Sequence, residues 1–131
     1  MRMTFLRPLL DEPAAHYRLE NVRSGRVVAE QVMTAFDSGT RRKGLLGRES
    51  LPESSALILA PTNAIHTFFM RFAIDVAFVT REGRVVKTHH ALEPWRMAGA
   101  LRAHAVIELP AGSLSRADTR AGDQLTLVRA I

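Results

Sequence analysis

The hairpin that decides the fold reads IDVAFV at residues 74–79, REG at 81–83 and RVVKTH at 84–89. Its arms are rich in β-branched residues, and a glycine lies in the turn between them, which is typical of two antiparallel strands. An apolar run, ALILA at 56–60, stops at a Pro-Thr-Asn turn and predicts a strand that is buried on both faces. The two segments place a β-sheet at the centre of the fold.

Further strands are expected on both sides of this centre. Residues 16–22 and 26–30 alternate polar and apolar around an Arg-Ser-Gly turn and predict a second hairpin. Residues 105–109 and 124–129 predict two more strands, and residues 113–117 fit a single helical turn. Strands of this number with little helix predict a mainly β domain (α+β with minor helix), namely a compact barrel-like or rolled antiparallel sheet with one or two short helices.

The remaining segments carry weaker patterns. Residues 1–15 contain two prolines and little periodicity, so we expect an irregular lead-in to a single domain over residues 16–131. Residues 37–47 begin with an Asp-Ser cap and end at a glycine, which predicts a short helix. Residues 91–103 hold a proline, a tryptophan and a glycine, and indicate a loop that crosses the surface.

Composition excludes several classes of protein. The chain has 131 residues, of which 47% are hydrophobic and 24% charged, so it is long and apolar enough to bury a core. It has no cysteine, which excludes disulfides, thiolate metal sites and a cysteine nucleophile. The formal charge is +5, but the basic residues are scattered and are not interleaved with aromatic ones. We therefore expect no nucleic-acid partner.

Location, cofactors and assembly follow from what the sequence contains. It has no apolar run of about 18 residues and no signal-peptide core near its start, which predicts no membrane span and a cytoplasmic protein. An extracytoplasmic location stays open if a leader has been trimmed. His89 and His90 are adjacent on a predicted strand, so one should pack inward and the other face solvent, and they cannot serve one metal. We expect no metal or cofactor, and a monomer or weak homodimer.

The segment NAIHTFFMRFAID at residues 63–75 mixes large apolar side chains with His66, Arg71 and Asp75. Polar groups in such a run must face water or find partners. One interpretation is a concave site, in which Asp75 orients His66 and Arg71 attracts an anion. The structural alternative pairs Asp75 with an arginine or with a turn, and His66 with a carbonyl.

A second candidate edge lies further along the chain. Trp95 and Arg96 could stack and grip a carboxylate, a phosphate or a sugar acid, although a tryptophan beside a proline is also a usual anchor for a loop. Arg48 could join them. For Glu108 we expect a structural ion pair with one of the arginines.

These blocks resemble a known family. RRKGLLGR at 41–48, the apolar strand at 56–60, IHTFFMRFAIDVAF at 65–78, PWR at 94–96 and ELPAG at 108–112 are similar, in order and spacing, to the prokaryotic domain of unknown function 192 family, over about residues 20–128. Ala73 departs from the proline that the family usually has there. The resemblance implies a compact, mainly β fold and no established activity.

The leading hypothesis is a non-enzymatic domain that binds a small anionic or sugar-like molecule. The alternative is a hydrolase-like enzyme with His66 as general base and Asp75 behind it. A third hypothesis is an accessory module that binds a protein through Phe68, Phe69 and Trp95. The residues assigned to the ligand site are Arg48, His66, Arg71, Asp75, Trp95 and Arg96.

Overall fold

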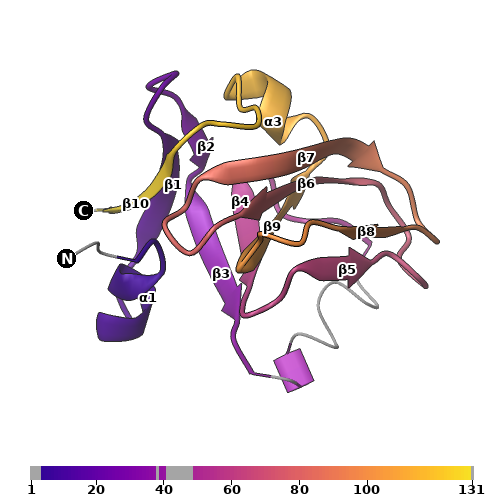
Figure 1. The fold of residues 1–131 in the computed structure, drawn as a ribbon, viewed down its shortest axis with the longest axis horizontal. Helices are drawn as coiled ribbons and strands as arrows, with labels where there is room; N and C mark the ends of the chain where they lie inside the picture. The colour runs from indigo at the N-terminus through magenta and orange to yellow at the C-terminus, as the bar shows by residue number, and fades with distance from the viewer. Residues whose placement is uncertain (1–3, 38, 41–48, 131) are drawn as a thin grey trace.

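The computed structural model describes residues 4–37, 39–40 and 49–130 and consists mainly of β-strands (Figure 1). Three sheets have the strand orders β10-β1-β2, β3-β4-β9-β6-β7 and β5-β8. The elements are α1 (Arg7–Asp11), β1 (Tyr17–Asn21), β2 (Val27–Ala29), β3 (Gln31–Ala35), β4 (Ser55–Leu59), β5 (Ala64–His66), β6 (Ile74–Val79), β7 (Val85–Leu92), β8 (Met97–Gly99), β9 (Ala105–Pro110), α3 (Ser113–Arg116) and β10 (Leu125–Arg129).

The predicted central hairpin is confirmed as β6 and β7, which pair antiparallel. Gly83 in its turn has a φ of 89°, a left-handed conformation that favours glycine. A Cβ atom there would also lie 2.7 Å from the ring of Phe5, so the turn and the N-terminal segment can approach only because this residue has no side chain. The hairpin of β1 and β2, the strands β4, β9 and β10, and the single turn of α3 are confirmed as well.

The five-stranded sheet differs from the prediction in one pair of strands. It was expected to be antiparallel throughout, but β3 runs parallel to β4, from Gln31 opposite Ser55 to Ala35 opposite Leu59. A parallel pair needs a long crossover, and the connection over residues 36–54 supplies it. Every residue of β4 is buried, as its continuous apolar run predicted.

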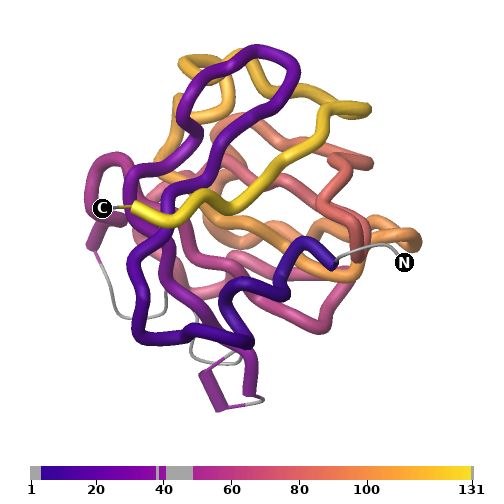
Figure 2. The backbone as a smooth tube through the Cα atoms, turned by 90° about the vertical axis from the view of Figure 1, so that its left-hand side faces the viewer, coloured from indigo at the N-terminus to yellow at the C-terminus, as the bar shows by residue number. Residues whose placement is uncertain are grey.

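Two apolar cores lie on the two faces of this sheet. The first core fills the space between the five-stranded sheet and the sheet β10-β1-β2, with Leu19, Ile107 and Leu109 among its fully buried residues. Figure 2 looks onto the side where β10 runs beside β1. The second core lies on the opposite face, where Val76 and Phe78 are buried. The described strands therefore roll around two cores without closing into a barrel.

The two-stranded sheet β5-β8, here called the ribbon, was not predicted. Its strands have three residues each and pair Ala64 with Gly99 and His66 with Met97. Ile65 and Ala98 pack against the second core, so the ribbon covers that face of the five-stranded sheet. The expected surface loop over residues 91–103 is thus partly a strand.

Residues 4–15 are also more ordered than expected. Pro8 lies in the first turn of α1, where a missing N–H costs nothing. Phe5, Leu6 and Leu9 are buried in the first core. The helix predicted at residues 37–47 lies largely outside the described residues. At its expected start, Asp37 Oδ1 accepts a hydrogen bond of 2.8 Å from the Thr40 N–H.

Within the described part of the chain, no helix is long and apolar enough to span a bilayer. The same residues include no group of three or more histidine or acidic side chains that could hold a metal ion.

Candidate functional site

Thr67 joins the two loops that form the exposed end of the ribbon. It is fully buried, and its hydroxyl donates to the Glu93 carbonyl at 2.6 Å and accepts from the Arg96 N–H at 2.9 Å. Its backbone N–H donates to the Arg96 carbonyl at 2.8 Å, and its own carbonyl accepts from the Trp95 N–H at 3.0 Å. Thr67 therefore holds the segment after β5 against the segment before β8. The sequence gives no signal for this role beyond the position of Thr67 between His66 and Phe68.

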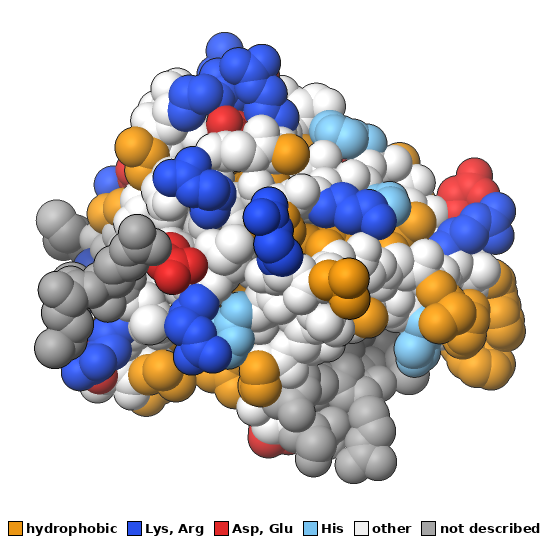
Figure 3. Space-filling model, in the orientation of Figure 1, with side chains coloured by type: hydrophobic (Ala, Val, Ile, Leu, Met, Phe, Trp, Pro, Cys, Tyr) orange, Lys and Arg blue, Asp and Glu red, His pale blue; other side chains and the backbone are white. Residues whose placement is uncertain are grey.

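Four rings in mutual contact surround this anchor and form what we call the aromatic platform: His66, Phe68, Phe69 and Trp95. Ring centroids are 4.9 Å apart for His66 and Phe68, 5.9 Å for Phe68 and Trp95, and 4.6 Å for Phe69 and Trp95. Trp95 is 56% exposed and Phe69 68% exposed. Figure 3 shows apolar, basic, acidic and histidine side chains gathered at the corresponding edge of the molecule. Large aromatic side chains that are clustered and exposed mark a binding surface.

Two of the five described non-glycine residues with a positive φ lie in the same platform. Phe69 and Trp95 both have a φ of 66°, a left-handed conformation that costs a bulky side chain about 1–3 kcal/mol. The hydrogen bond from the Trp95 N–H to Thr67 helps to hold one of them. Strain of this kind is found at functional sites, because the surrounding structure must maintain it.

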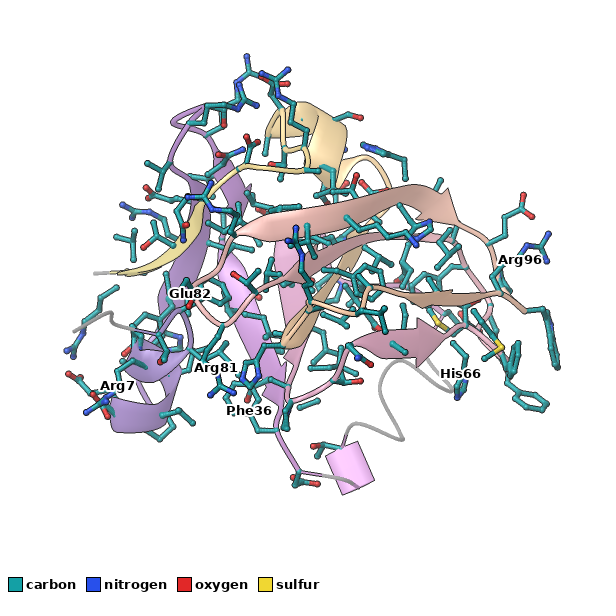
Figure 4. All side chains as sticks on the ribbon, viewed as in Figure 1. Arg7, Phe36, His66, Arg81, Glu82 and Arg96 are labelled. Carbon is teal, nitrogen blue, oxygen red and sulfur yellow. The ribbon has the colours of Figure 1, made fainter. Side chains whose placement is uncertain are left out.

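Two of the predicted arginines are exposed, and each is close in sequence to a residue of the platform. Arg96 is exposed beside the platform, and its guanidinium lies 3.3 Å from Glu93 (Figure 4). Arg71 is also exposed and lies 3.6 Å from Glu49. Exposed ion pairs contribute little to stability, so both guanidinium groups can exchange their partner for a bound anion. Arg48, the third predicted arginine, lies outside the described residues.

His66 is exposed at the end of β5. Its Nδ1 accepts a hydrogen bond of 3.3 Å from the Phe68 N–H, which orients the ring onto Phe68. A neutral imidazole that accepts at Nδ1 carries its proton on Nε2. His66 thus offers the platform a ring face and a donor.

Asp75 does not belong to this site, which corrects both its predicted place below the ligand and its pairing with His66. It is fully buried and pairs with Leu109, which lies in the first core, so its side chain is on the face of the sheet opposite to the ribbon. Its Oδ1 accepts from the Ala91 N–H at 2.9 Å, and its Oδ2 accepts from the N–H groups of Gly112 and Leu114 at 3.0 and 2.9 Å. The structure thus agrees with the structural alternative, in which the Asp75 carboxylate accepts hydrogen bonds from the backbone of turns.

Glu108 also differs from its expected role. It is 4% exposed, and its Oε2 has no hydrogen-bond partner, so the predicted ion pair with an arginine is not formed there. Burial raises the pKa of its carboxyl to about 7. The adjacent histidines behave as predicted: His90 is exposed, whereas His89 packs against Phe78 with ring centroids 6.1 Å apart.

A separate pocket of about 410 Å³ lies between β2 and α3. None of the five predicted site residues that the structure describes lines it. Its walls are formed by Val27, Val28, Glu53, Ser54, Ser113 and Arg116.

The family model DUF192, described as Uncharacterized ACR, matches residues 20–127. The chain belongs to this family. The DUF192 match contains the platform and both corrected carboxylates, Asp75 and Glu108. The resemblance in the five sequence blocks is confirmed.

Two solved structures share this DUF192 fold. One is a candidate transcription regulator from Sinorhizobium meliloti 1021, which is 22% identical with a TM-score of 0.75, over 86% of this chain and 92% of that one. The other is a protein of unknown function from Novosphingobium aromaticivorans DSM 12444, also 22% identical, with a TM-score of 0.71 over 84% and 82% of the two chains. A search of curated proteins gives no match. At these identities the likeness shows the fold alone.

The anchoring role of Thr67 can be tested by removing only its hydroxyl. Thr67→Val should lower the free energy of unfolding by about 1–2 kcal/mol, because the Arg96 N–H loses its acceptor. It should also shift the fluorescence of Trp95, the only tryptophan of the chain, because the platform loses its link to Glu93 and Arg96. Urea unfolding and emission spectra measure both effects. Thr34→Val, an exposed threonine on β3, is the matched control, and equal behaviour of the two variants would contradict the role.

Proposed function

We propose that this chain is a non-enzymatic binding domain that takes a small anionic or sugar-like molecule on its aromatic platform. The observation that carries the proposal is the stack of the half-buried Phe68 on the exposed Trp95, which Arg96 follows directly in the chain. Arg71, three residues after Phe68, supplies a second exposed guanidinium. The exposed ring of Phe69 also contacts Trp95, in a tilted arrangement.

The chemistry of the platform matches this class of ligand. Aromatic faces carry a negative quadrupole and pack against the C–H face of a sugar ring, whereas a guanidinium grips carboxylate or phosphate oxygens with two parallel hydrogen bonds. The donor at His66 Nε2 can reach a hydroxyl group on the same ligand. Thr67 and the strained backbone hold the rings in place before the ligand arrives, which reduces the entropic cost of binding.

The hydrolase alternative loses its geometric basis. A general base at His66 needs an orienting partner, and the carboxylate proposed for that role is engaged by three backbone N–H groups on the other face of the sheet. Binding on the platform needs no such partner.

A second candidate function uses the same surface. Phe69 is 68% exposed and Met97 75% exposed, more than ligand-lining side chains in a concave pocket usually are. Aromatic and methionine side chains are enriched at protein interfaces, so an accessory module that binds another protein is the alternative reading of the platform.

A fluorescence titration tests the small-ligand proposal, with D-glucuronate as the probe and D-glucose as its uncharged counterpart. We expect D-glucuronate to change the emission of Trp95 in a saturable way and D-glucose to bind more weakly. Arg96→Ala should weaken D-glucuronate binding about tenfold, because one charge-assisted contact is lost. Phe68→Ala should weaken binding of both sugars.

Arg7→Ala is the matched control, since Arg7 is an exposed, ion-paired arginine at the other end of the molecule (Figure 4). Its affinity should equal that of the unmodified chain. An equal loss in Arg7→Ala and Arg96→Ala would mean that only the net charge matters and would contradict the proposal. If D-glucuronate, glucose 6-phosphate and small carboxylates all leave the fluorescence emission of Trp95 unchanged, the protein-binding alternative is favoured.

A further inference from the structure

Glu108 is the one acidic side chain among the described residues of the second core. It lies on β9, directly opposite Leu57 on β4 and Val76 on β6. Directly opposed residues of antiparallel strands point to the same face, and both neighbours belong to the second core. The carboxyl group is therefore inside the apolar face that the ribbon covers.

Among the described residues, one oxygen of this carboxyl group is buried without compensation. Glu108 is 4% exposed and its Oε2 has no hydrogen-bond partner. A charged carboxylate is unfavourable in a buried position, and burial raises the pKa of this group to about 7. In the folded protein the carboxyl group is therefore neutral at low pH and ionises only near neutrality. Below that range, the second core holds a neutral carboxylic acid; above it, an unpaired charge.

His89 and Lys87 are the titratable side chains that face this core from β7. His89 lies opposite Val76, with that valine between it and Glu108, and its Nε2 is likewise buried without a partner. Burial, and then the charge of Lys87, lower the pKa of His89, which favours its neutral form and disfavours a positive charge that would balance the carboxylate. The Lys87 Nζ donates to the Gly99 carbonyl of the ribbon at 3.0 Å.

The other elements packed on this face contribute apolar groups to the second core. They are Met33 of β3, Ile65 and Ala98 of the ribbon, and the loop residues Leu51 and Met70. His104 precedes β9 on the same side of the strand, but it lies toward Arg81 and Glu82, at the opposite end of the sheet from Arg96 (Figure 4).

We propose that Glu108 is an internal proton-binding site, and that its proton controls how closely the ribbon packs on the five-stranded sheet. With the proton bound, the ribbon closes over a neutral core. When the proton leaves, the carboxylate requires water. Because the first core blocks the opposite face of the sheet, water enters between ribbon and sheet and loosens the ribbon.

The proton of Glu108 affects the platform as well, because the ribbon strands continue directly into the platform residues. Met97 begins β8 directly after Trp95 and Arg96, and His66 ends β5. A looser ribbon thus moves both halves of the platform that Thr67 holds together. We also expect ligand affinity to fall as the pH rises through neutrality, and this expectation rests on the proposed function. The loosening of the ribbon does not depend on that function.

Amide hydrogen exchange tests the ribbon without any ligand. The reporters are the Thr62 N–H, which donates to the His104 carbonyl at 3.0 Å, and the Ala100 N–H, which donates to the Asn63 carbonyl at 2.9 Å. Protection factors, corrected for the intrinsic rate, are compared between about pH 5.5 and 8.5. We expect them to fall at least about tenfold with a midpoint near 7 in the unmodified chain.

Glu108→Gln keeps the shape and removes the titration, so its protection should not change with pH. Glu108→Met serves the same purpose if the glutamine variant does not fold. Glu53→Gln, an exposed glutamate, and His89→Asn should both keep the transition of the unmodified chain. Protection independent of pH in the unmodified chain, or a transition that persists without Glu108, overturns the proposal. A transition that depends on His89 alone would assign the proton to that residue instead.

Discussion

Replacing Asp75 by alanine should lower the free energy of unfolding by about 4 kcal/mol or more. The carboxylate accepts three backbone hydrogen bonds in a fully buried position, and a hydrogen bond to a charged group contributes about 1.5–3 kcal/mol. Two of the donors, Ala91 and Gly112, have left-handed backbone conformations that the carboxylate helps to hold. Urea unfolding monitored by circular dichroism measures the loss.

Asp11→Ala is the control for the Asp75 variant, because the exposed pair of Asp11 with Arg7 should contribute less than about 1 kcal/mol. Asp75→Asn keeps the shape but turns a donor toward backbone N–H groups, so it should also be destabilising. A stable Asp75→Ala protein that has lost only ligand binding would return Asp75 to the binding site and contradict its structural assignment.

Glu108 should make the protein less stable as the pH rises toward neutrality. Its pKa is about 7 in the folded state and about 4.5 in the unfolded state, so the folded protein binds the extra proton between these values. The stabilising contribution is complete below about pH 4.5, falls as the pH rises, and is lost above about pH 7, for a total of about 3 kcal/mol.

The difference between Glu108→Gln and the unmodified chain isolates this contribution. The pKa values of His89 and His104 are lowered in the folded protein, so these two histidines make stability rise with pH, opposite to the effect of Glu108. Both proteins contain these histidines, so their contribution cancels in the difference. Urea unfolding at several pH values should show the variant gaining about 3 kcal/mol relative to the unmodified chain between pH 4.5 and 7.5. A difference that does not change with pH would mean that Glu108 is solvated or paired in solution.

The sequence predicts the hairpin of β6 and β7 and the buried strand β4 because their signals are local. Strand alternation, β-branched residues and a glycine turn are visible within a few residues. The ribbon carries no such signal, since its two strands are short and their pairing joins residues 64–66 to 97–99 across the chain. The parallel pairing of β3 is also non-local, because it depends on the crossover over residues 36–54.

For the candidate site too, local sequence patterns indicate some of the residues, whereas non-local contacts decide the rest. His66, Trp95 and Arg96 lie at one end of the molecule, as the pattern of polar and aromatic residues suggested. Arg71 is exposed and close to them in sequence. Asp75 is separated from them by the sheet, because which face a strand residue occupies depends on the core that covers it. The sequence predicts an ion pair between Glu108 and an arginine, and the structure shows a buried carboxyl group instead. No local pattern reveals that the cross-strand neighbours of Glu108 are apolar.

We propose that the exposed end of the ribbon is the binding site. Chemical-shift mapping of backbone amides during a titration with D-glucuronate tests this proposal. We expect the perturbed amides to cluster in residues 66–71 and 93–97, around the platform. Perturbations confined to the pocket between β2 and α3, at Val28, Ser54 and Arg116, or spread evenly over the surface, would contradict it.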